Sequence, residues 1–98
     1  MKFKLNRKHI DFEYEFMDGE SARFTYLEPT TEMIDEMAEV EFASSKNKLK
    51  VVKDVLEKTL IGDEKKIEKL IEEQTKEGNL YAFKEELDRE LGKLTKKR

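Results

Sequence analysis

The sequence predicts an α+β fold, in which an N-terminal β-hairpin or small antiparallel sheet packs on about four short amphipathic helices. Two patterns lead to this prediction. Residues 10–16 and 22–26 alternate between apolar and polar side chains, which is the period of two typical of half-buried strands. The rest of the chain repeats its apolar residues every three or four positions, which is the period of an amphipathic helix.

Length and composition predict a single domain. The chain has 98 residues, of which 37% are hydrophobic and 44% are charged. A chain of this size buries about two thirds of the surface that its unfolded form exposes, which is enough for one core. We expect one domain over residues 1–98, with a β-hairpin region at 1–28, an acidic helix at 29–43 and a helical region at 47–95.

The turn at Met17-Asp18-Gly19 determines the register of the predicted hairpin. A two-residue loop would place Ser21 and Arg23 opposite aromatic residues on the buried face, so we reject it. A three-residue loop with Gly19 in the left-handed region avoids this mismatch. It pairs Ile10 with Tyr26, Phe12 with Phe24, Glu13 with Arg23 and Tyr14 with Ala22. Phe3 and Leu5 are candidates for a third strand.

An acidic helix follows the hairpin. Pro29 ends the strand pattern, because proline cannot donate to a sheet ladder and fits the first turn of a helix. From Thr30 the apolar residues take helical spacing, and we expect Met33 and Met37 to pack in the core, although methionine also suits adaptable binding surfaces. This helix carries five carboxylates and no basic residue, namely Glu32, Asp35, Glu36, Glu39 and Glu41.

The second half of the chain predicts three further amphipathic helices. Glycine is expected to end the first two of them, and Asp63 and Asn79 are the expected N-caps of the helices that follow. The apolar stripes are Leu49 to Leu60, Ile67 to Ile71 and Leu80 to Leu94, with Gly62 and Gly78 between them. Connections of two or three residues imply that consecutive helices pack on one another.

Charge is distributed unevenly along the chain. Residues 1–45 carry five basic and eleven acidic side chains, a net charge of −6, whereas residues 46–98 carry fifteen basic and twelve acidic, a net charge of +3. Four lysines open the second half at a helix N-terminus, where cations are unfavourable and phosphate binds readily: Lys46, Lys48, Lys50 and Lys53.

This lysine cluster has two candidate partners. One is a nucleic acid, which would make the chain a small nucleic-acid-binding regulatory protein. The other is the acidic helix, either of the same chain or of another copy. The net charge of −3 for the whole chain, and the lack of arginine or aromatic residues among the lysines, favour the second.

The composition argues against an enzyme, a cofactor and a metal site. Without cysteine there is no disulfide framework, thiol nucleophile or cysteine-type zinc site. The single histidine, His9, precedes the first clear strand, where we expect a solvated turn residue. Adjacent carboxylates such as Glu72 and Glu73 lie neither beside a histidine nor in a calcium loop, so we expect a solvated surface.

No segment of the sequence predicts contact with a membrane. The longest apolar runs fall far short of the roughly 20 residues that cross a bilayer, and the N-terminus lacks the apolar stretch of a signal peptide. We therefore expect a cytoplasmic protein without a membrane partner.

The order of these elements resembles that of the small tail assembly chaperones of long-tailed bacteriophages and prophages. The resemblance lies in the hairpin of Asp11 to Tyr26, the hinge Leu27-Glu28-Pro29-Thr30, the acidic helix and a charged helical tail that contains residues 52–56 and 67–73. It implies a non-catalytic protein in the bacterial cytoplasm that coats the apolar tape-measure protein and recruits tail-tube subunits during tail assembly. It also implies self-association into a homo-oligomer.

The resemblance supplies no site residues, because it has no motif to align. From the residues themselves we expect partner proteins to bind at the hairpin tip around Met17 and along the helices that follow Lys46. Charge from Lys46, Lys48, Lys50 and Lys53 would orient such a partner and speed its association.

Overall fold

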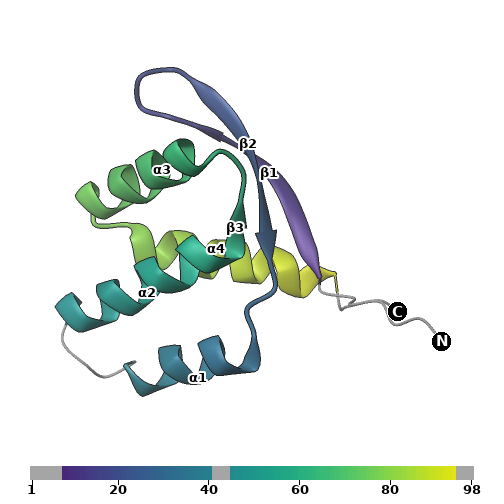
Figure 1. Cartoon of the computed structure of the whole chain (residues 1–98), viewed down its shortest axis with the longest axis vertical. Coiled ribbons are helices and arrows are strands. Elements are labelled where there is room, and N and C mark those ends of the chain that lie inside the picture. The colour runs from purple at the N-terminus through teal and green to yellow at the C-terminus, as the bar shows by residue number, and fades with distance from the viewer. Residues whose placement is uncertain (1–7, 41–44, 95–98) are drawn as a thin grey trace.

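The computed structural model describes residues 8–40 and 45–94. This part of the chain forms a three-stranded antiparallel sheet with four helices packed against it, which confirms the predicted α+β fold (Figure 1). The elements are β1 (His9–Glu15), β2 (Ser21–Leu27), α1 (Thr31–Glu39), α2 (Ser45–Thr59), β3 (Leu60–Ile61), α3 (Glu64–Lys76) and α4 (Leu80–Lys93). None of the described helices has the length and apolar character that crossing a membrane requires.

The β1–β2 hairpin has the predicted register. Phe12 lies opposite Phe24, Glu13 opposite Arg23 and Tyr14 opposite Ala22. The loop closes with two backbone hydrogen bonds, from the Phe16 N–H to the Glu20 carbonyl at 2.7 Å and from the Gly19 N–H to the Phe16 carbonyl at 2.9 Å. Gly19 has a φ of +94°, so the three-residue loop with a left-handed glycine is confirmed.

The third described strand is β3, and the prediction that the helix from Leu49 includes Leu60 and ends just before Gly62 is wrong. Helix α2 ends at Thr59, and Leu60 and Ile61 pair with Tyr26 and Thr25 of β2 instead. This pairing buries Leu60 and satisfies backbone groups on the second side of β2. The candidate strand at Phe3 and Leu5 lies outside the described residues.

The ends of the helices agree with most of the predicted caps. The Asp63 carboxylate accepts a hydrogen bond from the Lys66 N–H at 3.1 Å, as expected of an N-cap. At the other end of α3, Gly78 has a φ of +67°, and the N–H groups of Gly78 and Asn79 donate to carbonyls of the last turn. Asn79 is the N-cap of α4 as expected, but its side chain makes no capping hydrogen bond, and its amide donates to the Gln74 side chain instead.

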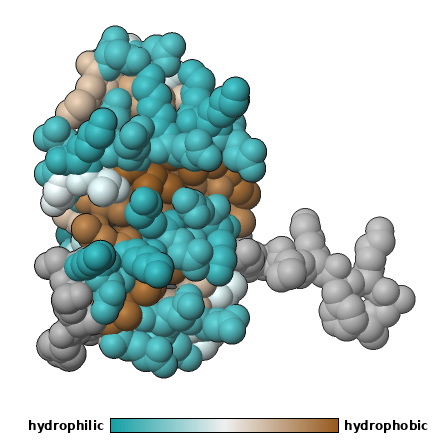
Figure 2. Space-filling view, turned by 60° about the vertical axis from the view of Figure 1, so that its left-hand side comes forward, coloured by the Kyte–Doolittle hydropathy of each residue, from teal (hydrophilic) through white to brown (hydrophobic). Residues whose placement is uncertain are grey.

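Aromatic residues on the inner face of the sheet join it to α4. Phe24 and Tyr26 are buried, and the Phe83 ring of α4 lies 6.2 Å from the Phe12 ring and 6.0 Å from the Tyr14 ring. Figure 1 shows α3, α2 and α1 following one another beside the sheet, with α3 next to the hairpin tip. In Figure 2 the apolar residues visible on one face form a band between the levels of α3 and α2, with polar residues above and below it.

Candidate functional site

Helix α1 is the least buried element of the structure. Thr30 is its N-cap and accepts a hydrogen bond from the Met33 N–H at 3.2 Å, so the helix begins two residues after Pro29 rather than at it. Its nine residues have a clear apolar side, yet none of them is buried. Met33 and Met37 are half-buried, with Met37 packed against the core, and Ile34 is 55% exposed.

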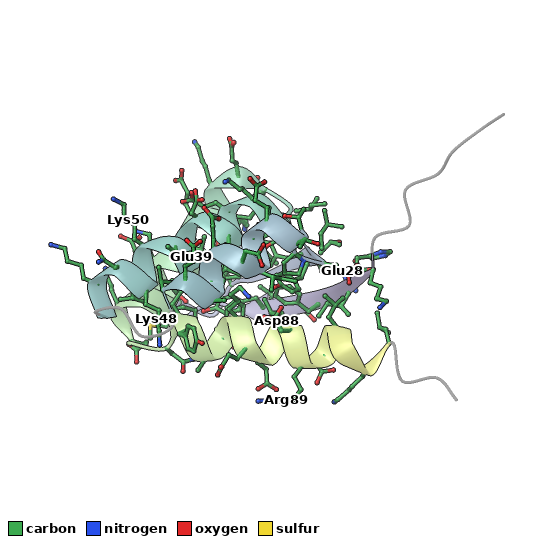
Figure 3. The ribbon with its side chains drawn as sticks, turned by 90° about the horizontal axis from the view of Figure 1, so that it is seen from below. Glu28, Glu39, Lys48, Lys50, Asp88 and Arg89 are labelled. Carbon is green, nitrogen blue, oxygen red and sulfur yellow. The ribbon has the colours of Figure 1, made fainter. Side chains whose placement is uncertain are left out.

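A cleft of about 410 Å³ lies between α1 and α4. Its apolar side chains come from both helices, and its charged side chains come from α4 and from the segments that flank the hairpin. Figure 3 shows Asp88 between the ribbons of α1 and α4, whereas Arg89 points away from α1. The lining residues are Lys8, Glu28, Pro29, Met33, Ile34, Met37, Tyr81, Lys84, Glu85, Asp88, Leu91 and Gly92.

Tyr26, Lys84 and Asp88 meet beside this cleft. The Tyr26 hydroxyl donates to Asp88 Oδ1 at 2.5 Å, and Lys84 Nζ donates to Asp88 Oδ2 at 2.7 Å. Tyr26 is fully buried and Lys84 is 6% exposed, while the Asp88 side chain is 39% exposed toward solvent. Burial raises the pKa of Tyr26 far above its ordinary value, and the hydrogen bond to the Asp88 carboxylate raises it further. The phenol is therefore a neutral donor at all ordinary pH values.

The lining of the cleft has an apolar half and a charged half. Its carboxylates and lysines are joined by no histidine, and no group of three or more potential metal ligands occurs in the described residues. The apolar half of the lining, from Met33, Ile34 and Leu91, matches a ligand with an apolar face. Glu85 on the other half provides a hydrogen-bond acceptor for its polar edge.

Sequence reasoning missed this cleft, although α4 contains a signal for it. Lys84 falls in the stripe of Leu80, Leu87 and Leu91, at spacings of four, three and four. A lysine in an otherwise apolar stripe must be buried with a partner or mark an opening in the core. Asp88, four residues later, is that partner.

The predicted site residue Met17 lies far from the cleft, at the tip of the hairpin. Its side chain is 68% exposed, and its backbone N–H donates to both oxygens of the Glu73 carboxylate, at 3.3 and 3.2 Å. Figure 1 shows this tip at the end of the molecule opposite α1. The two surfaces therefore cannot share one small partner segment.

Ion pairs fix the hairpin tip to α3 below Met17. Lys69 Nζ donates to Asp18 Oδ2 at 2.7 Å and to Glu20 Oε1 at 3.2 Å, and it lies 4.5 Å from the centre of the Phe16 ring. The hydrogen bond from Lys69 lowers the pKa of Asp18, and the same bond raises the pKa of Lys69. These pairs join the acidic first half of the chain to the basic second half within one molecule.

Acid is expected to loosen the hairpin tip. Because the pKa of Asp18 is lowered from its ordinary value of 3.8, its contribution to stability is present above that value and is lost as the pH falls through the lowered pKa. We expect hydrogen exchange of the Gly19 and Glu20 amides to accelerate over this range, relative to that of the helices. Asp18→Asn should remove most of the pH dependence. In a Lys69→Met background the same change should have a much smaller effect, and an equal effect in both backgrounds would contradict the assignment.

The four lysines of the predicted cluster do not act as one surface. Lys48 Nζ lies 4.6 Å from the centre of the Tyr81 ring of α4, and Figure 3 shows Lys50 on the side of α2 away from α4. Lys50 and Lys53 line a hollow of about 380 Å³ with Glu36 of α1 and with Asp54 and Glu57 of α2. Lys46 is exposed near the start of α2.

Carboxylates are therefore mixed with the cluster, and one of them belongs to the acidic helix α1. Nucleic-acid binding through these lysines stays a prediction.

No protein-family model, curated protein or solved structure matches the chain.

Proposed function

We propose that the chain is a non-catalytic assembly protein that binds partner proteins through the cleft between α1 and α4. One observation carries the proposal: α1 is an amphipathic helix without a buried residue, and it holds half-exposed apolar side chains over an open cleft. A helix of nine residues is too short to be stable by itself in water and needs apolar packing to persist. A partner segment in the cleft would complete that packing.

The composition of the cleft supports an amphipathic protein segment as the ligand. Two methionines line it, and methionine adapts its shape to different partners more readily than branched side chains do. A volume of about 410 Å³ accommodates a few apolar side chains rather than a whole helix. The carboxylate of Glu85 suits a basic or amide side chain next to it.

The resemblance to tail assembly chaperones gives this proposal its specific form. In that form the partners are tape-measure and tail-tube proteins, bound in the bacterial cytoplasm during phage or prophage tail morphogenesis, and the chain associates with itself as a homo-oligomer. The open apolar cleft supports a chaperone of this kind, since such a protein must cover apolar surface of an unassembled partner.

A pair of isoleucines provides the test. Ile34 in the cleft is 55% exposed, and Ile61 in β3 is 51% exposed and does not line the cleft. Burial of half an isoleucine side chain contributes about 1.4 kcal/mol, which is about tenfold in affinity. We expect Ile34→Gln to weaken binding to purified tape-measure or tail-tube protein of the same genome about tenfold. Ile61→Gln should change it less than twofold.

Several outcomes of this titration would contradict the proposal. Equal losses for the two variants would exclude the cleft as the binding surface. Failure of the unaltered chain to bind either protein would remove the tail-assembly form of the proposal. Binding to DNA or RNA that weakens steeply with salt, and that depends on Lys48 and Lys50, would favour the nucleic-acid alternative instead.

A further inference from the structure

Strand β1 forms one edge of the sheet. The strand order is β1-β2-β3, so β2 separates β1 from β3, and no described residue is paired with the outer side of β1. Figure 1 shows the first part of β1 on the side of β2 away from β3. An edge strand of seven residues is long enough to accept a further strand.

The hydrogen bonds of the hairpin identify the backbone groups that face outward. The Glu28 N–H donates to the Lys8 carbonyl at 2.8 Å, and the Phe16 N–H donates to the Glu20 carbonyl at 2.7 Å. Hydrogen-bonded pairs alternate along an antiparallel ladder, so the even-numbered residues of β1 bond to β2. The N–H and C=O groups of His9, Asp11, Glu13 and Glu15 therefore point toward the open edge.

The same four residues carry exposed side chains on the outer face of the sheet. Three of them are carboxylates at every second position, so the edge presents a row of negative charge beside a row of backbone donors and acceptors. On the other face Ile10, Phe12 and Tyr14 are only half-buried, although they pack against the core. A strand added at this edge would extend their apolar face and would place its remaining side chains next to the carboxylates.

Two β1 edges do not fit one another in antiparallel pairing. Antiparallel pairing of two β1 strands through their outward-facing groups brings odd-numbered residues opposite one another. Every such register that is centred on the strand places Asp11 or Glu13 opposite Asp11 or Glu13 of the second copy. Like charges directly opposite one another in a ladder are destabilising, and charged edges of this kind are a known protection against self-association.

We propose that the β1 edge binds an extended segment of a partner protein in which lysine or arginine alternates with apolar residues. The segment adds a fourth strand to the sheet. Its backbone pairs with His9, Asp11, Glu13 and Glu15, its basic side chains lie opposite the carboxylates, and its apolar side chains continue the face of Phe12 and Tyr14. This site is separate from the α1–α4 cleft, so it does not depend on the function proposed above.

A peptide of four Lys-Val repeats with blocked ends is a suitable probe, and hydrogen exchange measured by NMR is the readout. At saturating peptide we expect exchange of the Asp11, Glu13 and Glu15 amides to slow at least tenfold. The amides of Phe12 and Tyr14, which already bond to β2, should change little. Slow exchange of the odd-numbered amides in the free chain would overturn the proposal, because the edge would then be covered already. The proposal would also be overturned if the peptide bound without slowing exchange at every second amide of β1.

Matched peptides and variants separate strand addition from simple charge attraction. Methylation of the peptide nitrogens that face β1 should abolish binding, whereas methylation of the alternate nitrogens should not. We expect Glu13→Gln with Glu15→Gln to weaken binding about tenfold, and Glu64→Gln with Glu68→Gln, an equal change of charge on α3, to weaken it less than twofold. Equal losses in the two double variants, or equal binding of a Glu-Val peptide, would overturn the proposal.

Discussion

Replacement of Asp88 by alanine is expected to lower the free energy of unfolding by about 3 kcal/mol. The change removes the acceptor of two buried donors at once, the Tyr26 hydroxyl and the Lys84 ammonium group. An ammonium group left in the interior without its partner costs several kcal/mol, and an unpaired buried hydroxyl adds to that cost. Asp88 is partly exposed, so water from the cleft can reach Lys84 once the carboxylate is removed. The expected loss of stability is therefore near the lower end of the range measured for broken buried ion pairs.

Urea unfolding followed by circular dichroism measures this effect, and α4 offers a matched control. Glu86 pairs with Arg89 at 2.6 Å, but both side chains are 61% exposed, so Glu86→Ala should change the stability by less than about 0.5 kcal/mol. Both variants remove one carboxylate from α4, so they differ chiefly in the burial of the partner. A loss for Asp88→Ala as small as that for Glu86→Ala would show that Lys84 finds another partner.

A triple replacement tests whether the unpaired buried donors cause the loss of stability. Tyr26→Phe, Lys84→Met and Asp88→Leu together remove both donors and the acceptor and leave an apolar cluster of similar volume. Buried polar networks replaced in this way often keep their stability, so we expect the triple variant to lie within about 1 kcal/mol of the unaltered chain. A triple variant as unstable as Asp88→Ala would mean that the network itself stabilises the fold. The network would then be structural rather than part of a binding surface.

The hairpin could be predicted in detail because several independent signals agree on it. The alternation from Ile10 to Phe16 fixes which side chains face the core, and Gly19 supplies the one left-handed residue that a three-residue loop needs. A shift of register by one residue would bury carboxylates. Patterns of this kind are local and can be identified from the sequence, although the aromatic face that they define is buried only against the helices.

Strand β3 has no local signal, and the one signal for the cleft, Lys84 in the apolar stripe of α4, does not show which element lies opposite it. Two residues are too few to show a period of two, and Leu60 also completes the apolar stripe of α2. Its conformation is decided by β2, which has an open side that Leu60 and Ile61 occupy. The apolar side of α1 likewise looks like that of any packed helix, and only the tertiary arrangement shows that no residue of α1 is buried.

The oppositely charged halves of the sequence contact one another in the folded chain. Lys66 and Lys69 of α3 pair with the acidic hairpin tip, and Glu36 of α1 shares a hollow with Lys50 and Lys53 of α2. Much of the charge contrast is thus used within the molecule. Among residues 45–94, no lysine or arginine forms an ion pair with the acidic row along β1. The negative charge of that row is therefore available to a basic partner segment.

Replacement of Gly62 by alanine is expected to lower the free energy of unfolding by about 1 to 3 kcal/mol, whereas the same replacement at Gly92 should raise it by about 0.5 to 1 kcal/mol. A Cβ atom at Gly62 would lie 2.9 Å from Cδ1 of Phe24 and 3.4 Å from the Arg23 carbonyl oxygen. Phe24 is 2% exposed and packed against other rings, so its ring cannot move aside without disturbing the core. The close approach exists because Gly62 follows β3, which pairs with β2 next to Phe24.

Gly92 provides the matched control, because the chemical change is identical and the surroundings are not. It lies within α4, and a Cβ atom there would meet no atom within 4 Å. Alanine then adds helix propensity without a steric cost. Urea unfolding measures both effects, and hydrogen exchange at Leu60 and Ile61 locates the damage from Gly62→Ala in the β2–β3 pairing. Stability changes of the same sign at the two glycines would contradict the close approach of Gly62 to Phe24.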